Sequence, residues 1–369
     1  MFRSMFLLRC FILLLVLTGC KNELQLNAPY KELPSIYAVL NPQEKTQVIR
    51  INKVFLGEGD AGVMAKVADS VNYPAGELTV SLTRFVNGVQ ADVSPQTPGD
   101  RTIVFNEKVD SNIREGAFSR VQRLWVSDRK LFTNGQYRLE VKNNRTGNVF
   151  TARAEAIDSI RGNFFRPLTL DFVYPYPPGT MPDEYIDYST NNGSVIFTPN
   201  SAKLYQVMIR THFFDSSAAG KRFDYVDYEF GTREEKTKTI QGNISLINVS
   251  FRNNDYWVAV GLALAKKNLT PNIYGRKVFM IEYFVYATTQ EYIDFMQFSA
   301  PSFALTQNSP LYSNFDERAA LGIFTFRSRY SVKKQPASTM VNEFSRNANT
   351  CEYRFFNSAS PPEILGCQF

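Results

Sequence analysis

Short runs in which apolar and polar residues alternate fill the chain from residue 34 to residue 160. Residues 36–40 are apolar and end at Asn41-Pro42, and residues 46–55 then alternate, so the two runs predict a β-hairpin. Asn87-Gly88 is the dipeptide that a type I′ hairpin turn favours. Further strand patterns lie at residues 78–82, 102–105, 123–126, 136–141 and 148–154. Regular short strands with turn residues between them are typical of an antiparallel sandwich.

A second series of strand patterns follows, from residue 161 to residue 330. Alternating or apolar runs lie at residues 195–198, 203–213, 225–230, 242–251, 277–286 and 322–327. Residues 256–264 are apolar without alternation, which predicts a buried strand. Residues 289–298 predict a helix, because Thr288 is a suitable N-cap and apolar residues recur at helical spacing.

These patterns predict an all-β fold of two antiparallel β-sandwich domains, Ig-like or transthyretin-like, with one or two short helices. The first domain is expected at residues 34–160, where a short helix at 61–69 interrupts the strands. The second domain is expected at residues 161–330. The remaining residues, 331–369, are polar and predict a C-terminal tail packed on the second domain.

The N-terminus has the pattern of a signal peptide, residues 1–19. Arg3 and Arg9 are its only charges, and residues 11–17 are an apolar run shorter than the roughly 20 residues of a membrane-spanning helix. The run ends in Leu17-Thr18-Gly19-Cys20, which resembles the lipobox of bacterial lipoproteins. In that family the cysteine becomes the first mature residue and carries a diacylglycerol and an N-acyl chain. The alternative is an ordinary cleaved signal in which Cys20 has no role.

Acylation of Cys20 would make residues 20–33 a lipidated tether and the rest of the chain a body held at a membrane. Several acyl chains give stable attachment, because each buried CH₂ contributes about 0.8 kcal/mol. Lys21 follows the cysteine, in place of the aspartate that retains such proteins at the inner membrane. We therefore expect an outer-membrane location, with the body facing the periplasm or the cell surface.

Composition narrows the chemistry that the chain can perform. The sequence of 369 residues contains one histidine, His212, which removes most hydrolases with a histidine base and most histidine-based metal sites. We expect His212 to be a strand residue with a hydrogen-bonded nitrogen. The net charge of +6 falls to +4 when the two arginines of the signal are removed, which is too mild for a nucleic-acid-binding surface.

Two cysteines remain after the signal and the lipobox are set aside. Cys351 and Cys367 lie 16 positions apart near the C-terminus, and the compartment beyond the inner membrane permits disulfides. A bridge closing such a loop would stabilise the fold by roughly 3 kcal/mol. Two free thiols are the alternative. Catalytic thiol chemistry is not expected, because neither cysteine lies in a CxxC pair.

Catalytic and metal-binding motifs are weak throughout the sequence. Asp224, Asp227 and Glu229 alternate and would offer oxygens to Ca²⁺, but an extended segment favours a solvated strand face instead. The sequence contains no glycine-rich phosphate loop, GxSxG elbow or HExxH motif. Two acids about 5–10 Å apart would suffice for glycan hydrolysis, and sequence alone places no such pair. We expect no enzyme activity, no cofactor and no metal.

Aromatic residues are the better candidates for function, since they make up 14% of the chain. Tyr174 and Tyr176 lie in a Tyr-Pro-Tyr-Pro-Pro segment whose prolines forbid a central strand. This segment is either an exposed contact loop or a strut between the domains. Tyr256, Trp257 and Tyr274 are further candidates for exposed rings that stack on sugar or peptide. The alternative for each ring is a place in the core.

Two parts of the sequence resemble a family of Bacteroidetes lipoproteins. The first is Tyr37-Ala38-Val39-Leu40-Asn41-Pro42 with the following residues 48–59. The second is Thr289-Gln290-Glu291-Tyr292, followed by residues 310–315 and 321–324. In these motifs the chain is similar to the DUF4249-like outer-membrane lipoproteins. That resemblance implies an accessory lipoprotein encoded near TonB-dependent receptors, and it brings no catalytic residues.

The sequence thus predicts a cell-envelope lipoprotein with a non-enzymatic binding or assembly role, bound to the membrane through its N-terminal lipid. The expected partner is a TonB-dependent outer-membrane receptor or another envelope protein, with a glycan or a peptide as ligand and without nucleic acid. One alternative is a structural or adhesive surface protein. The other is a carboxylate-based glycan hydrolase.

Overall fold

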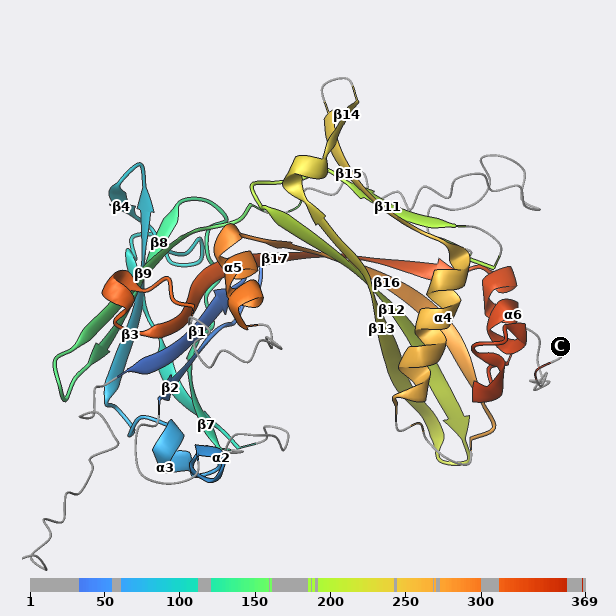
Figure 1. The fold of residues 1–369 in the computed structure, drawn as a ribbon, viewed down its shortest axis with the longest axis horizontal. Coiled ribbons are helices and arrows are strands. Elements are labelled where there is room, and N and C mark those ends of the chain that lie inside the picture. Colours follow the sequence, from blue (N-terminus) through green and yellow to red (C-terminus); the bar gives the residue numbers. More distant parts are fainter. Residues whose placement is uncertain are drawn as a thin grey trace, which may run out of the picture.

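The computed structural model describes the chain from residue 33 to residue 367 with gaps. The described residues are 33–54, 61–111, 121–158, 160, 185–186, 188–189, 192–241, 244–267, 269, 273–299, 312–356 and 367. The described part is mostly β with several antiparallel sheets, which confirms the coarse fold expected from the sequence. The expected number of one or two short helices is wrong, because the described residues form five α-helices. The molecule is elongated, with one β-rich unit at each end (Figure 1).

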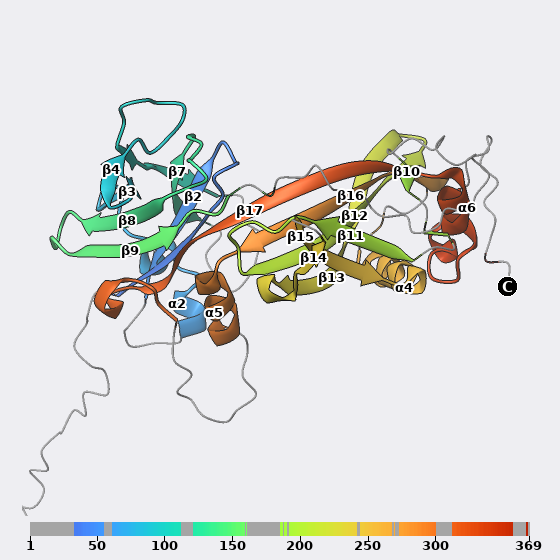
Figure 2. The same ribbon diagram turned by 90° about the horizontal axis from the view of Figure 1, so that it is seen from above.

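Two sheets facing one another form the N-terminal unit (Figure 2). One sheet contains β1 (Pro34–Leu40), β2 (Gln47–Lys53), β7 (Gln122–Ser127) and β6 (Asn106–Asp110). The other contains β4 (Val89–Ala91), β3 (Leu78–Val86), β8 (Gln136–Asn143) and β9 (Val149–Glu155), with β5 (Thr102–Val104) on β3. Their facing residues are buried, among them Ile36, Ile51 and Trp125 on one sheet and Val80 and Leu139 on the other.

Both hairpins expected in this unit are present. β1 and β2 pair antiparallel from Pro34↔Lys53 to Tyr37↔Arg50. At the tip between β3 and β4, φ is 50° at Asn87 and 77° at Gly88, as a type I′ turn requires. The helix expected at residues 61–69 is instead two short helices, α2 (Ala61–Met64) and α3 (Ala68–Val71).

One long strand, β17 (Leu321–Pro336), belongs to both units. Its first six residues pair parallel with β1, from Ser35↔Leu321 to Leu40↔Phe326. The following residues, 327–334, pair antiparallel with β16 (Gly275–Thr288). β16 pairs with β12 (Leu204–Ser217), and β12 with β13 (Gly220–Glu234), so one sheet runs through the molecule in the order β13-β12-β16-β17-β1-β2-β7-β6. Residues 331–336, expected to begin a tail, are therefore strand.

Gly322 permits the close approach of β17 to β1. Its φ is +110°, a conformation that side chains rarely adopt. A Cβ at this position would lie 2.0 Å from the backbone oxygen of Ile36, the residue with which Gly322 is paired. Only glycine therefore fits where the strand joins the N-terminal sheet.

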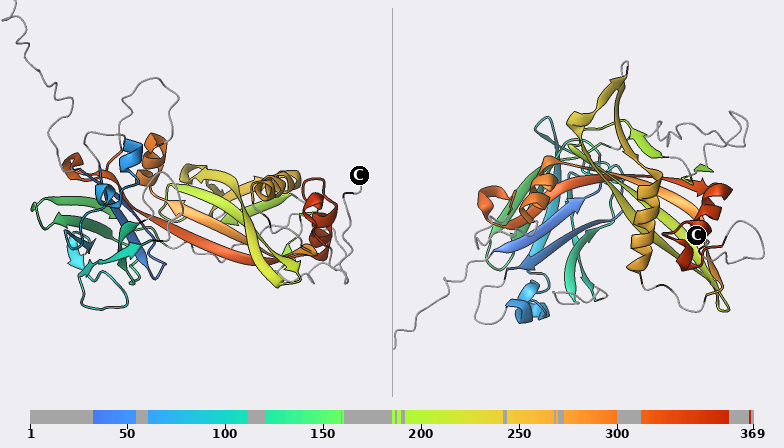
Figure 3. Two further views of the ribbon diagram at one scale, coloured as in Figure 1. Left: turned by 90° about the horizontal axis from the view of Figure 1, so that it is seen from below. Right: turned by 45° about the vertical axis from the view of Figure 1, so that its right-hand side comes forward.

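The C-terminal unit covers one face of this sheet with helices and a small sheet (Figure 3). The helices are α4 (Asn253–Ala265) and α6 (Ser338–Arg346), and the three-stranded sheet contains β11 (Gly193–Phe197), β15 (Ile244–Phe251) and β14 (Thr239–Gln241). The buried strand expected at residues 256–264 is wrong, because this segment is α4. The buried residues of α4 recur at helical spacing. Val258 and Leu262 on its exposed side are also apolar, so the sequence shows no helical period of apolar and polar residues.

The remaining elements are short and lie at the ends or at the junction. α5 (Gln290–Ser299) matches the helix expected at residues 289–298 and contacts β17. β10 (Tyr185–Ile186) pairs parallel with the end of β17. Three 3₁₀ turns lie at Glu235–Thr237, Asp316–Arg318 and Cys351–Tyr353.

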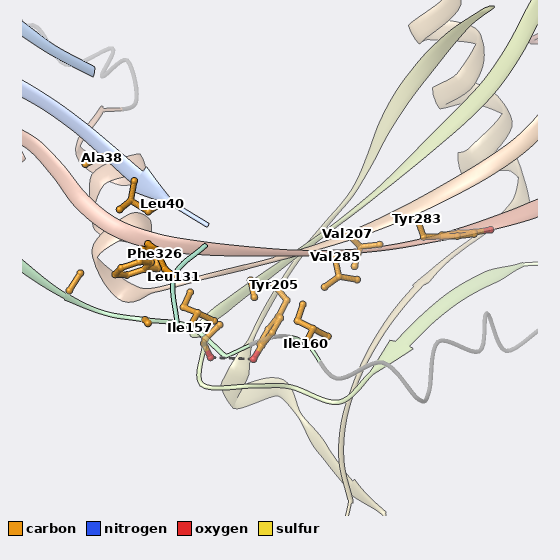
Figure 4. Close-up of a cluster of buried hydrophobic side chains, with 14 of the residues drawn as sticks. Ala38, Leu40, Leu131, Ile157, Ile160, Tyr205, Val207, Tyr283, Val285 and Phe326 are labelled. Atoms are coloured by element: carbon orange, nitrogen blue, oxygen red, sulfur yellow. Dashed lines mark hydrogen bonds between the residues drawn. The ribbon is translucent and has the colours of Figure 1, made fainter. Parts of the chain in front are cut away.

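The hydrophobic core continues across the junction of the two units. Ala38 and Leu40 of β1 and Leu131 belong to one buried cluster with Tyr205 and Val207 of β12 (Figure 4). Ile157 and Ile160, at the boundary expected between two domains, lie inside this cluster. The continuous hydrophobic core and the strand β17, which belongs to both units, fix the two units to one another.

Candidate functional site

The two faces of the long sheet in the C-terminal unit differ in what they carry. Alternate residues of a strand point to opposite faces. Tyr205, Val207, Ile209, Thr211 and Phe213 of β12 are buried on the side of α4, which we name the covered face. The opposite side, named the open face, is formed by Arg210, His212, Phe214, Phe223, Tyr225, Asp227, Phe279, Glu282, Phe284, Tyr286, Arg327 and Arg329.

Four phenylalanines gather at the distal end of the open face, and we name them the phenyl cluster. Phe214, Phe223, Phe279 and Phe356 have ring centroids 5.6 Å apart for Phe223–Phe279 and 6.0 to 6.3 Å apart for the contacts of Phe214. Phe223 is 66% exposed. The ammonium of Lys221 lies 4.6 Å from the ring of Phe214. The cluster is thus an apolar surface with a positive rim.

The C-terminal segment supplies Phe356 to this cluster through a buried clamp. Arg276 forms an ion pair with Asp215 at 2.7 Å, and both side chains are almost fully buried. The Arg276 guanidinium also donates to the carbonyl oxygen of Tyr353 at 2.7 Å, and the backbone N–H of Phe356 donates to the carbonyl oxygen of Arg276 at 2.9 Å. The same segment begins at Cys351, whose sulfur is bonded to that of Cys367.

Arg210 is held flat in the middle of the open face. Its guanidinium lies 3.8 Å from the ring centroid of Tyr225 and 5.1 Å from that of Phe284. Two hydrogen bonds, of 2.7 and 2.9 Å, join it to both carboxylate oxygens of Asp227 on the neighbouring strand. These bonds raise the pKa of Arg210 above its usual value. The cation is therefore fixed by its own neighbours, as a bidentate pair between aromatic rings.

The only histidine lies beside this pair. His212 Nε2 is 3.0 Å from a carboxylate oxygen of Glu282, and both side chains are largely buried. Its ring lies 6.0 Å from those of Tyr225 and Phe279. The prediction of a mid-strand histidine with a hydrogen-bonded nitrogen is confirmed. The ring is part of the packing of the open face.

Arginines and rings continue to alternate toward the junction. Arg327 lies 3.9 Å from the ring centroid of Tyr286 and donates to the amide oxygen of Gln206 at 2.9 Å. Arg329 lies 5.7 Å from the ring of Phe284 and pairs with Glu44 at 2.9 Å. Each cation thus has an aromatic ring and a polar partner.

Aromatic residues around α5 extend the surface onto the N-terminal unit. Tyr37, 44% exposed, lies 5.9 Å from Phe295, and Phe298 stacks on Tyr312 at 6.1 Å. Burial, with Glu291 and Asp294 nearby, raises the pKa of Tyr312 to about 12. Its hydroxyl therefore stays neutral at ordinary pH.

Two of the three acids considered for calcium are paired with cations. Asp227 binds Arg210, and Asp224 binds the ammonium of Lys267. Burial is the largest single influence on the Asp224 carboxyl and opposes its ionisation. The hydrogen bonds from Lys267 and from the backbone N–H of Tyr225, with the charges of Lys267 and Arg222, together outweigh burial and lower the pKa of this carboxyl. No group of three or more metal-ligating side chains occurs among the described residues.

A groove runs along the edge of the sheet between β13 and α4. Its volume is about 560 Å³, and it is lined by Asp227, Tyr228, Glu229, Asp255, Val258, Ala259, Leu262, Ala263 and Lys266. Asp255 is hydrogen-bonded to Arg252, which lowers the pKa of its carboxyl. A glycosidase acid needs the opposite, a pKa raised toward neutrality. Asp255 is therefore not suited to act as the general acid of a glycosidase.

The candidate residues from the sequence divide into three groups. Cys20, Tyr174 and Tyr176 lie outside the described residues. The interpretation of Tyr256 and Trp257 as exposed is wrong, because both are fully buried: Tyr256 shares a hydrogen bond with Thr211 and Trp257 donates to the carbonyl oxygen of Tyr188. Tyr274 is exposed, as expected. The phenyl cluster was not anticipated from the sequence.

Among the described helices, none has both the length and the apolar character needed to cross a membrane. No protein-family model matches the sequence. No curated protein matches it either.

Proposed function

We propose that this chain is a lipid-anchored cell-envelope protein that binds a partner through the open face and does not catalyse a reaction. The phenyl cluster is the observation that carries the proposal. An apolar ring such as Phe223, 66% exposed beside Lys221, gains free energy when a partner covers it. Exposed apolar patches with a polar rim mark interaction sites.

The arrangement of charges on the open face supports binding over catalysis. Arg210 with Asp227, and His212 with Glu282, already hold one another in fixed geometry. A preorganised surface of this kind loses little conformational entropy when a partner docks. The proposed partner is an envelope protein such as a TonB-dependent receptor, with a glycan or peptide as the ligand that the complex handles.

The membrane anchor is proposed on sequence grounds. The Leu17-Thr18-Gly19-Cys20 motif supports acylation of Cys20 and an outer-membrane location. The resemblance to DUF4249-like lipoproteins supports the same placement. For the fold, we propose that the N-terminal unit, in which the strands β1-β2-β7-β6 face the sheet β4-β3-β8-β9, is related to Ig-like or transthyretin-like sandwiches.

Site-specific photo-crosslinking tests the proposed binding face. A benzophenone amino acid replaces Phe223 in the full-length lipoprotein, and envelopes are irradiated before purification. A matched control carries the same group at Ile240, an exposed residue on β14. We expect a defined envelope adduct from position 223 and none from position 240.

The outcomes of this experiment separate the candidate functions. Adducts of equal yield at both positions, or none at position 223, would overturn the binding role of the open face. Adducts that contain only second copies of this chain would favour the structural or adhesive alternative instead.

A further inference from the structure

β13 leaves one edge of the long sheet open. It pairs with β12 along its whole length, and it is the last strand in the described sheet order on that side. An edge strand presents backbone N–H and C=O groups that another chain can bind.

The outward-pointing backbone groups belong to alternate residues. In an antiparallel ladder, each residue directs both of its backbone groups either toward its partner strand or away from it. Lys267 donates to the carbonyl oxygen of Tyr225 from outside the sheet, which identifies Lys221, Phe223, Tyr225, Asp227 and Glu229 as the outward set. Lys267 occupies the carbonyl oxygen of Tyr225, and beyond Tyr225 the outward groups of Asp227 and Glu229 follow.

A β-bulge closes the other end of this window. The pairing of β12 with β13 shifts register between Val207 and Met208, so that Phe230 is an extra residue. Gly231, which follows, has φ of 118°. Between Lys267 and the bulge, the regular edge therefore spans Asp227, Tyr228 and Glu229, the same β13 residues that line the groove beside α4.

Different chemistry lies on the two sides of this edge. On the side of α4, Val258 is 38% and Leu262 59% exposed, and both line the groove with Tyr228. On the open face, Asp227 and Glu229 point to the opposite side of the sheet. Among the described residues Glu229 has no cation within ion-pair distance, whereas Asp227 is paired with Arg210.

We propose that this edge binds an extended peptide segment of another protein by strand addition, with apolar and basic side chains alternating along the segment. Apolar residues would pack on Val258 and Leu262, and basic residues would face Asp227 and Glu229. A second copy of the same edge is the wrong occupant, because pairing the two edges would bring like charges together. The proposal concerns the edge and not the phenyl cluster, so it stands or fails separately from the proposed function.

A peptide of alternating lysine and valine, seven residues long and fluorescently labelled, is the direct probe. Its binding to the full-length lipoprotein in detergent is measured by anisotropy. A peptide of the same composition with its lysines in one block is the control for charge alone, and an alternating glutamate–valine peptide is the control for sign. We expect binding of the first peptide only.

N-methylated versions of the probe test the backbone hydrogen bonds. In antiparallel addition the N–H groups of the lysines point to β13, so methylating the lysine nitrogens abolishes binding and methylating the valine nitrogens does not. Parallel addition reverses the two results. Strand addition would be overturned if both methylated peptides bind, or if neither of them binds.

Protein variants locate the site. Leu262→Lys and Glu229→Lys are each expected to weaken binding about ten-fold, through lost apolar contact and lost charge complementarity. Ile240→Lys adds the same single positive charge as Leu262→Lys, but on β14, and is expected to leave binding unchanged. Circular dichroism of each variant shows that it is folded, and equal affinities for all three would place the peptide elsewhere.

Discussion

The covered and open faces come from the same strands, yet they are stabilised in different ways. On the covered face, Tyr205 and Val207 are removed from water by α4 and the small sheet, so transfer of apolar surface dominates. On the open face, Arg210 and Asp227 stay near water and hold each other and the rings around them. The covered face is stabilised by burial of apolar side chains, whereas the side chains of the open face are fixed by their contacts with one another. A face built in the second way can present aromatic rings to a partner.

The largest expected effect comes from the covered face. Trp257→Ala removes a fully buried indole and its hydrogen bond to Tyr188, which should cost about 3–5 kcal/mol of unfolding free energy. Urea denaturation followed by circular dichroism measures this loss. A loss below about 1 kcal/mol would show that the two faces are not stabilised as differently as the burial indicates.

A similar loss is expected when the buried clamp is broken. Arg276→Met leaves Asp215 charged and unpaired, which should cost about 3–5 kcal/mol. The double variant Arg276→Met/Asp215→Leu should recover most of that loss, because it removes both charges. Urea denaturation of the single and the double variant compares their losses of unfolding free energy. Equal losses would mean that the hydrogen bond of the Arg276 guanidinium to Tyr353 contributes more than its ion pair with Asp215.

The open face is expected to tolerate substitution. Phe223→Ser removes a ring that is largely exposed, so the unfolding free energy should change by less than about 1 kcal/mol. Partner binding should be lost in the same variant, measured as loss of the envelope adduct from a crosslinker placed at Tyr225. If Phe223→Ser lowers the unfolding free energy but leaves partner binding unchanged, Phe223 has a packing role and not a binding role.

The smallest expected effect is a pH dependence at the edge of the sheet. The pKa of Asp224 is lowered in the folded state, so its pair with Lys267 stabilises the fold above the ordinary value of about 3.8. That contribution is lost as the pH falls through the lower, folded pKa. Asp224→Asn should therefore be less stable than wild type at pH 7, and the difference should shrink as the pH falls below about 3.8. A difference that stays constant as the pH is lowered would point to lost hydrogen bonds instead of lost charge.

Much of the β architecture could be predicted because its strands alternate locally. β2, β8 and β12 each bury one face, and that period is visible in the sequence. α4 could not be predicted, because a helix that is apolar on its exposed side as well has no visible period. β17 belongs to both units because it pairs with β1, which lies nearly 290 positions away in the sequence. A local pattern of apolar and polar residues does not predict a pairing partner at that distance.

The candidate site escaped prediction for a related reason. Phe213 and Phe214 are adjacent, so one is buried and the other lies on the open face, and hydrophobicity alone does not distinguish them. Phe279 lies at the bulge opposite His212, where the register shifts. Only the three-dimensional pairing shows that these rings meet.

The parallel ladder between β1 and β17 has a mechanical consequence. β1 begins directly after the N-terminal segment proposed as the membrane tether, and its register with β17 extends over six residue pairs. A pull at residue 33 against a load held by β16 or β12 acts along these strands, so it shears the whole ladder at once instead of opening it one bond at a time. The strand that joins the two units is thereby also the element best placed to transmit tension between the anchor and whatever the distal end holds.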